Sequence, residues 1–281
     1  KSQHTDKKSY VLCTMIFNLF YLAFFKYADF TIDNLNIIFN TDLKHLNIPF
    51  PLALSFVTFQ TIAFLIDVYD EALDHLNFKK FSLFIIFFPQ LIAGPIVRYN
   101  NMLAQFEDQK NKKIQIDNIS IGAIIFLIGV IKKTFISDYI SIFVDQGFAA
   151  SNLTFLEAWL TSVGFTFQIY FDFSGYIDMA TGSALLFNIL LPKNFDSPFK
   201  ASSLIDFWKK WHITLFNFLM NYIYFPILRS IKSINFVNAM IVTLFVFIIS
   251  GFWHGPSWGY VIFGTLHGVG LVTNHIFNKI S

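Results

Sequence analysis

The sequence predicts an all-α protein that crosses a membrane several times. Of its 281 residues, 55% are hydrophobic and only 14% are charged, whereas soluble domains carry about 25% charged residues. The mean hydropathy is +0.55, and the apolar residues gather in long stretches without charge. A chain in a bilayer must satisfy its backbone hydrogen bonds internally, which a helix does within one segment. We therefore expect a polytopic membrane protein built of helices.

Seven apolar stretches are candidate membrane spans. Several are shorter than the roughly 20 residues that a spanning helix needs. Tilting, kinks at Pro51 or Pro89, or flanking lysines that snorkel to the interface would accommodate them. The stretches are Tyr10–Phe25, Ile48–Ile66, Phe81–Val97, Ile119–Ile131, Ala158–Phe171, Ile234–Trp253 and Trp258–Phe277.

The segments between these stretches are polar or irregular. Thr31–Leu46 mixes polar and apolar residues at helical spacing, which indicates an interfacial amphipathic helix or loop. Glu107–Lys113 is expected to be a soluble connector. Phe173–Lys200 contains glycines and prolines, so we expect irregular backbone that is buried in protein or lines a watery cavity. No repeat or linker divides the chain, and we predict a single membrane domain over residues 1–281.

The charge pattern points to lipid rather than to nucleic acid. The net charge is +2, and the lysines form short clusters between apolar stretches. Such clusters favour cytoplasmic loops or lipid headgroups, and no basic stripe suits a phosphate backbone. The single cysteine, Cys13, allows neither an intrachain disulfide nor a multi-cysteine metal site. Because the histidines show no HxxxH or HxH spacing, we predict no metal site.

His254 is the first candidate functional residue, because it ends the uncharged stretch Ile234–Trp253. An ionisable group at membrane depth costs about 3 kcal/mol or more and often marks a functional site. Either His254 caps a helix at the interface, or it transfers protons in or beside the membrane. The neighbours favour the second interpretation, since Gly255 permits close approach and the Trp253 indole can wall a cavity.

His212 is the second candidate and ends the sequence DFWKKWH at 206–212. On a helix Trp208, Trp211 and His212 would share one face, because they are spaced i, i+3 and i+4. The segment is then either an aromatic anchor at the interface or part of a cavity. In the second case its two lysines would attract an anionic substrate.

Two further segments place polar residues beside apolar sequence. In residues 168–180, two carboxylates six residues apart either pair with basic side chains or line a polar passage. No GxSxG elbow accompanies the serine there, so a hydrolase nucleophile is not expected. In residues 88–98, prolines and a glycine break a helix, which gives either a kinked span with a snorkelling arginine or a cavity wall. Candidate lining residues are Gln90, Arg98, Gln168, Asp172, Ser174, Asp178, Trp208, Trp211 and Trp253.

Five strings together resemble the membrane-bound O-acyltransferase family, and within it the bacterial branch similar to alginate O-acetyltransferases. They follow one another over most of the chain, and several are long. The strings are PLALSFVTFQ at 51–60, FPQLIAGPIVR at 88–98, QIYFDFSGYIDMA at 168–180, DFWKKWHITL at 206–215 and FWHGPSWGYVIFGTLHG at 252–268.

The resemblance implies a ring of transmembrane helices around a central funnel that narrows to a tunnel at the catalytic histidine. By the family motif that residue is His254, and His212 is the second histidine. Family members transfer an acyl group from a thioester to a hydroxyl. A base must remove the hydroxyl proton, and donors must stabilise the developing oxyanion.

The function expected from the resemblance is O-acetylation of a cell-envelope polysaccharide, or of a partner protein, in the cytoplasmic (inner) membrane of a bacterium. The expected co-substrate is an acyl thioester, acetyl-CoA, with no tightly bound cofactor. The expected partner is a periplasmic or extracellular protein of acyltransferase or esterase type.

Three alternatives stay open. Within the family, the chain could transfer D-alanine to teichoic acid from a carrier-protein thioester. Outside it, a transporter or flippase could relay protons through Asp172, Asp178 and His254, or the chain could be a non-catalytic assembly scaffold.

The chain departs from the branch in two places. Met220-Asn221 stand where the branch usually has an Arg-Asp pair, and the loop Leu228–Phe236 is short and lacks the usual glycines. A role of that pair in a loop or in substrate contact would be altered here. The resemblance also implies further spans before, and possibly after, this sequence, so we expect it to be a fragment.

Overall fold

The computed structural model describes residues 2–70, 72 and 77–280. Every regular element in these residues is a helix, and no strand occurs among them. The predicted all-α class is therefore confirmed. The chain divides into two compact units, Lys1–Leu76 with Phe195–Ser281, and Asn77–Asn194. We call them unit 1 and unit 2; the predicted single domain with its central funnel stays a prediction.

Three helical stretches of the described residues are long and apolar enough to cross a membrane. They are Lys8–Phe39 and Phe236–His254 in unit 1 and Ile116–Ala149 in unit 2. Each reaches the roughly 20 residues that the hydrocarbon core requires. The chain is thus a membrane protein, as its composition predicts.

Unit 1 begins with a helix much longer than predicted. α1 (Ser2–Phe39) contains the predicted span Tyr10–Phe25 and continues through most of the segment expected to lie at the interface. It ends where Asn40 takes a left-handed φ of 50°, a conformation that cannot continue a right-handed helix. The next helix, α2 (Leu54–Tyr69), starts later than the predicted Ile48.

Several short helices of unit 1 lie outside the predicted spans. They follow one another between the irregular segment after residue 185 and the long C-terminal helices. Residues 213–228 are uncharged and mostly apolar, but two asparagines and a proline interrupt them, and hydropathy does not show how they divide into short helices. The short helices are η3 (Pro198–Lys200), α9 (Leu204–Lys210), α10 (Ile213–Leu219), the π-helix η4 (Met220–Tyr224) and α11 (Phe225–Ser230).

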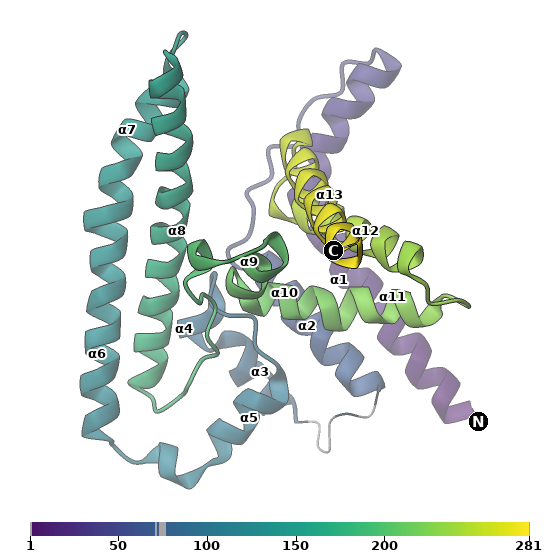
Figure 1. Cartoon of the computed structure of the whole chain (residues 1–281). Helices are drawn as coiled ribbons and strands as arrows, with labels where there is room; N and C mark the ends of the chain where they lie inside the picture. The colour runs from purple at the N-terminus through teal and green to yellow at the C-terminus, as the bar shows by residue number, and fades with distance from the viewer. Residues whose placement is uncertain (1, 71, 73–76, 281) are drawn as a thin grey trace. The chain divides into compact units, whose positions relative to one another are not determined.

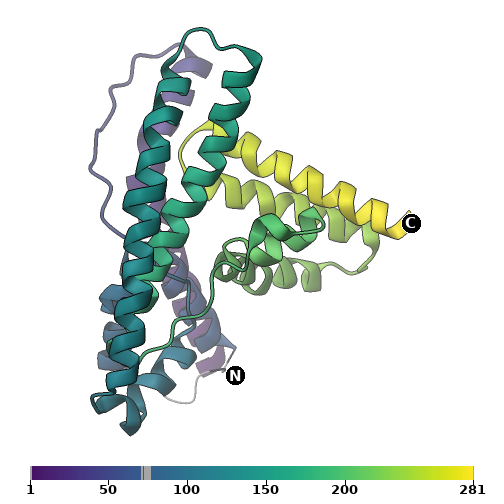
Figure 2. The ribbon, with the colours of Figure 1, turned by 60° about the vertical axis from the view of Figure 1, so that its left-hand side comes forward.

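A helical hairpin closes unit 1. α12 (Phe236–His254) and α13 (Trp258–Ile280) agree closely with the two predicted C-terminal spans and lie side by side (Figure 2). Small residues allow this close packing. A Cβ atom on Gly251 of α12 would lie 2.7 Å from the Cα of Gly264 of α13, so neither position has room for a side chain.

Unit 2 starts with short helices where one span was expected. No continuous helix covers the predicted span Phe81–Val97, because the stretch forms α3 (Phe78–Ile86) and α4 (Phe88–Leu91) and then leaves the helical conformation. The helix break predicted within residues 88–98 is confirmed. Phe87 between them is extended, and Pro89 lacks the N–H that a continuous helix would use. Further along lie α5 (Tyr99–Glu107) and the 3-10 turn η1 (Gln109–Lys112) in the predicted connector.

A long antiparallel pair forms the rest of unit 2 (Figure 1). α6 (Ile116–Val130), the π-helical segment η2 (Ile131–Ser137) and α7 (Asp138–Ala149) follow one another without a turn. The chain then reverses, and α8 (Phe155–Leu185) packs back along all three. The side chain of Thr154 starts α8 as the N-cap of a capping box.

The expectation of irregular backbone from residue 173 is wrong up to residue 185, where α8 ends. Its glycines were interpreted as helix breakers, but they are packing positions instead. A Cβ atom on Gly175 would lie 2.8 Å from the carbonyl oxygen of Gly129, and one on Gly122 would lie 2.8 Å from that of Gly182. Small residues on both helices thus let α6 and α8 approach closely.

Candidate active site

His254 is the last residue of α12, and its side chain is exposed. Its imidazole lies among aromatic rings from the two arms of the hairpin. The ring of Trp253 is 4.9 Å away, that of Phe263 is 6.2 Å away at 87°, and that of Tyr260 is 6.5 Å away and nearly parallel. Among the described residues, no hydrogen bond occupies the imidazole nitrogens of His254. They are therefore available to a substrate.

The turn after His254 is shaped by close approach of a ring. A Cβ atom on Gly255 would lie 3.0 Å from Cζ of Tyr260 and closer still to two other atoms of its ring. Gly255 is predicted to let another chain or a ligand approach closely, and the group that lies against it is the ring of Tyr260 of α13. This contact fixes the hairpin turn directly beside His254.

Helix α1 binds the end of α12 through two adjacent side chains. The ammonium group of Lys26 donates to the carbonyl oxygen of Trp253, and the Tyr27 hydroxyl donates to that of Phe252 at 2.9 Å. The rings of Tyr27 and Phe252 also stack, with centroids 4.4 Å apart. Sequence reasoning missed both residues. The sequence does contain one indication of Lys26, since it is a lysine with apolar residues on both sides.

Trp253 is buried between α12 and α2. Its ring stacks on Phe59 at 4.8 Å and meets Phe56 edge-on at 5.8 Å. Its indole Nε1 is buried and has no hydrogen-bond partner among the described residues. A buried N–H without a partner costs about 1–3 kcal/mol, so this donor is a candidate for binding a substrate oxygen.

His212 lies outside the helix that was expected to carry it. α9 ends at Lys210, and His212 takes a left-handed conformation with φ 45° and ψ 53° before α10 begins. The prediction that Trp208, Trp211 and His212 share a helical face is therefore wrong. The His212 side chain is only 3% exposed, and it lies within electrostatic reach of His254. Both predicted histidines thus lie in unit 1 and interact electrostatically.

The two tryptophans before His212 have different surroundings. Trp208 packs in a buried cluster with Phe247 of α12 and Leu271 of α13, and its Nε1, like that of Trp253, is buried without a partner among the described residues. Trp211 instead stacks on Phe207 with centroids 5.7 Å apart. Trp208 therefore lies in the core of unit 1.

A third histidine joins this region through rings. His267 of α13 lies 4.6 Å from the Phe263 ring and 5.1 Å from the Trp208 ring. Because Phe263 also contacts His254, rings connect His254 to the segment that carries His212. No group of three or more potential metal ligands occurs in the part of the chain that the structure describes.

One of the basic residues predicted to attract an anion is already paired. Lys210 forms an ion pair with Asp206 of the same helix at 2.7 Å. The Lys210 ammonium, followed by the Ser202 amide, holds the pKa of the Asp206 carboxyl below its usual value. Lys209 is exposed. The pairing leaves Lys210 less available to a substrate.

The predicted carboxylates of unit 2 pair with lysines of the facing helix. Asp178 of α8 lies 2.6 Å from Lys132. Lys133 bridges Asp172 of α8 and Asp138 at the start of α7, at 2.6 Å from each. These pairs correspond to the simpler of the two interpretations, in which the acids balance basic side chains.

The remaining predicted residues also lie in unit 2. Gln90 is fully buried, and its Nε2 donates to the carbonyl of Phe84 at 2.9 Å. Arg98 is exposed at the start of α5. Of the predicted residues, Gln90, Gln168 and Ser174 each have a buried side-chain oxygen without a hydrogen-bond partner among the described residues.

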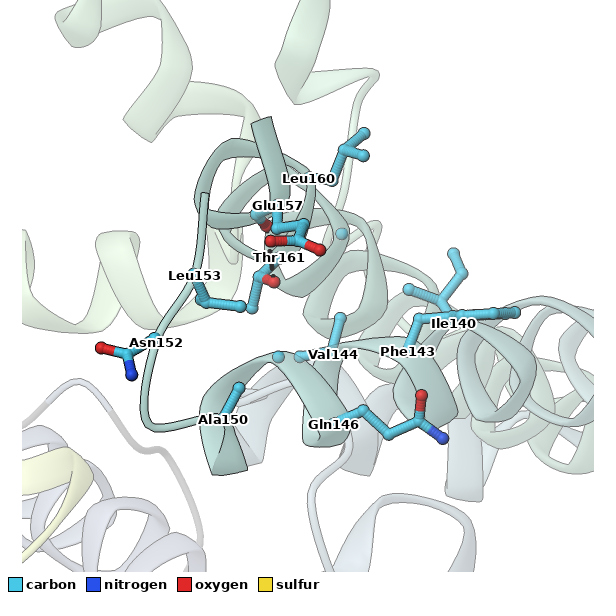
Figure 3. Close-up of a pocket in the computed structure, with 12 residues that line it drawn as sticks. Ile140, Phe143, Val144, Gln146, Ala150, Asn152, Leu153, Glu157, Leu160 and Thr161 are labelled. Atoms are coloured by element: carbon cyan, nitrogen blue, oxygen red, sulfur yellow. Dashed lines mark hydrogen bonds between the residues drawn. The ribbon is translucent and has the colours of Figure 1, made fainter. Parts of the chain in front are cut away.

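A pocket of about 440 Å³ lies in unit 2 where α7 meets α8 (Figure 3). Val144 and Gln146 of α7 lie on one side of it, and Glu157 and Thr161 of α8 on the other. The Glu157 carboxylate accepts hydrogen bonds from the backbone and hydroxyl of Thr154 at 2.8 and 2.7 Å. Its acid is thus used in the capping box, and none of the predicted site residues lines the pocket.

Comparison with known proteins places this geometry in a family context. The model of the membrane-bound O-acyltransferase family matches residues 65–280, which include both histidines. A peptidoglycan O-acetyltransferase of Helicobacter pylori is 42% identical over 97% of this chain and 56% of its own length. A probable alginate O-acetylase of Pseudomonas putida is 36% identical over 89% of this chain and 52% of its own.

A more distant relative is the teichoic acid D-alanyltransferase of Bacillus subtilis. It is 27% identical over 81% of this chain and 60% of its own length. The chain thus spans little more than half the length of these curated relatives.

Proposed function

Because the chain belongs to the membrane-bound O-acyltransferase family, we propose that the whole protein transfers an acyl group to a hydroxyl of a cell-envelope polymer, with His254 as general base. One observation carries the proposal. An exposed histidine, unpartnered among the described residues, ends the apolar helix α12 inside the matched region. An imidazole titrates near neutral pH and is therefore suited to accept a hydroxyl proton.

In the proposed reaction a carbon–oxygen bond replaces a carbon–sulfur bond, and one proton passes from the acceptor hydroxyl to the departing thiolate through His254. The acceptor oxygen attacks the thioester carbonyl carbon while its proton passes to a nitrogen of His254. The resulting oxyanion needs hydrogen-bond donors, and the unpartnered Nε1–H of Trp253, next to His254, is a candidate. Collapse of the intermediate breaks the carbon–sulfur bond, and the departing thiolate takes the proton from the imidazolium.

His212 is proposed to assist from a buried position. It lies within electrostatic reach of His254 and is almost fully shielded from solvent. A polar side chain fixed in this way can orient the neighbouring imidazole or a substrate hydroxyl.

The proposed donor is acetyl-CoA or another cytoplasmic acyl thioester, and the proposed acceptor is an envelope polysaccharide. Two of the relatives are named for O-acetylation, one of peptidoglycan and one, as a probable O-acetylase, of alginate. Transfer across a bilayer brings a cytoplasmic donor to an external acceptor, which suits a multi-pass protein of the bacterial cytoplasmic membrane. An acyltransferase- or esterase-like protein outside the membrane is the proposed partner.

The test is to replace His254 with Ala in the whole protein and measure base-released acetate from purified envelope polymer. We expect acetylation to disappear while expression and membrane insertion stay normal. His275→Ala, which replaces a histidine of the neighbouring helix α13, is the matched control and should leave acetylation unchanged. Undiminished acetate in the His254→Ala strain would overturn the proposal.

A second candidate is D-alanyl transfer to teichoic acid, because the chain also matches a D-alanyltransferase over most of its length. The same hydrolysate distinguishes the two functions, since it would contain D-alanine instead of acetate. A neighbouring gene for an alanine-activating ligase with its carrier protein would favour this second function.

A further inference from the structure

We propose that Lys26 of α1 is a positioning residue for His254, acting through the carbonyl group of Trp253. The inference rests on the proposed function, in which His254 is the general base. It adds a residue from outside the region that the family model matches, because that match begins at residue 65.

Lys26 has an unusual set of neighbours for a lysine within a membrane-spanning stretch. Its ammonium group donates to the carbonyl oxygen of Trp253 and contacts the Ser55 hydroxyl at 3.4 Å. It also lies 5.3 Å from the centre of the Trp253 ring. Among the described residues no carboxylate pairs with it. A cation at this depth is costly and tends to be kept where it has a function.

Snorkelling is the simplest alternative for such a lysine, since a long side chain can carry its charge to the headgroups. The contacts of Lys26 point the other way. Its ammonium group bonds inward to two other helices, α12 through Trp253 and α2 through Ser55. The charge is therefore used within unit 1.

The group that Lys26 binds belongs to a helix end. The last carbonyls of a helix have no partner within the helix, and they form the negative end of its dipole. Tyr27 donates to the carbonyl of Phe252, which also accepts from the Gly255 N–H, and Lys26 donates to the carbonyl of Trp253. Helix α1 thus binds two consecutive carbonyls directly before His254, and that of Trp253 depends on Lys26. Loss of the charged donor would leave the Trp253 carbonyl unpaired and loosen the terminal residue of α12.

A loosened helix end matters because His254 is that terminal residue. A displacement of about 1 Å in a catalytic group can cost about 100-fold in rate. The Trp253 ring is already held by Phe59 of α2. Lys26 adds a hold on the backbone of Trp253, so ring and carbonyl are fixed from different helices.

The experiment compares three variants of the whole protein in membrane vesicles. Acetyl-CoA is the probe donor and purified peptidoglycan fragments are the acceptor, and initial rates give kcat and KM. Lys26→Met removes the charged donor, and Lys26→Arg keeps it. Tyr27→Phe is the matched control, because it removes only the neutral donor to the adjacent carbonyl and keeps the stacked ring.

We expect Lys26→Met to lower kcat by about 10- to 100-fold with KM for acetyl-CoA unchanged. Lys26→Arg should recover most of the lost kcat, and Tyr27→Phe should lower kcat less than about 5-fold. Wild-type kcat in folded Lys26→Met, or an equal loss in Tyr27→Phe, would overturn the proposal. If Lys26→Met does not fold, Lys26→Gln replaces it with the same expectations.

If Lys26→Met and Lys26→Gln both fail to fold while Lys26→Arg folds, Lys26 is required for folding, and the proposal is overturned. His254→Ala is measured in parallel to separate this inference from the proposed function. Full activity of His254→Ala would reject the proposed function itself. An inactive His254→Ala with a fully active Lys26→Met would reject only the role of Lys26.

Discussion

Lys26 of unit 1 and the lysine pair Lys132 and Lys133 of unit 2 differ in the groups that their charges face. In unit 2, Lys132 and Lys133 face carboxylates of the neighbouring helices at 2.6 Å. In unit 1, Lys26 faces a backbone carbonyl and a hydroxyl beside His254. Charges that neutralise each other across a helix interface hold helices together. A charge that faces only neutral oxygens beside a candidate catalytic histidine is better explained by a role in the proposed site.

The same contrast applies to the glycines. Glycines on α6 and α8 bring two helices together at the ion pairs, whereas Gly255 makes room for a ring beside His254. Both kinds of glycine lie at close contacts. Of these glycines, Gly255 alone lies directly beside a candidate catalytic group, so a close contact by itself does not distinguish packing from function.

The largest expected effect is loss of the base. We expect His254→Ala to reduce kcat by about 1,000-fold, within the range that a general base contributes, and to leave the unfolding temperature in detergent unchanged. Initial rates and thermal unfolding of the purified protein measure both. A reduction in kcat of less than about 10-fold would contradict the role of His254 as general base.

The next effect tests the helix interface of unit 2. In Gly129→Ala the new Cβ atom would lie 2.5 Å from the carbonyl oxygen of Gly175 and 2.7 Å from the backbone nitrogen of Met179. Backbone atoms cannot move aside cheaply, so we expect a loss of about 2 kcal/mol of stability. Thermal unfolding measures it. Gly259→Ala is the control, since its Cβ atom would meet only ordinary contact at 3.6 Å. Equal stability of the two variants would contradict the packing account.

The smallest effect concerns the ion pair itself. Lys132 and Asp178 are each about a quarter exposed, at 26% and 28%, so solvent screens the pair and we expect Asp178→Asn to cost about 1 kcal/mol. Activity per folded molecule should be unchanged. A large drop in kcat with normal stability would instead support the proton relay through Asp172 and Asp178.

The fold was predictable where one signal dominated. α12 and α13 could be predicted to within a few residues, because each is one long apolar stretch with a clear end. The predicted helix in the region of α8 ended too early, because Gly175 and Gly182 are of a residue type that often breaks helices. Only the facing glycines of α6 show that they are packing positions. The bend at His212 rests on a left-handed backbone that helical spacing does not reveal.

The candidate site was predictable in part. His254 and His212 follow from the sequence because each stands in an aromatic, family-like string. Lys26 does not, because its partner Trp253 lies 227 residues further along the chain. A contact of this kind becomes visible only once α1 is placed against the end of α12.

The most direct test of the comparison is to measure kcat and unfolding temperature for Lys26→Met and Lys132→Met side by side. We expect Lys26→Met to lose about 10-fold or more in kcat while its unfolding temperature changes little. Lys132→Met should unfold about 2–4 °C earlier and keep the wild-type kcat per folded molecule. The opposite pattern, with kcat lost in Lys132→Met and retained in Lys26→Met, would contradict the account.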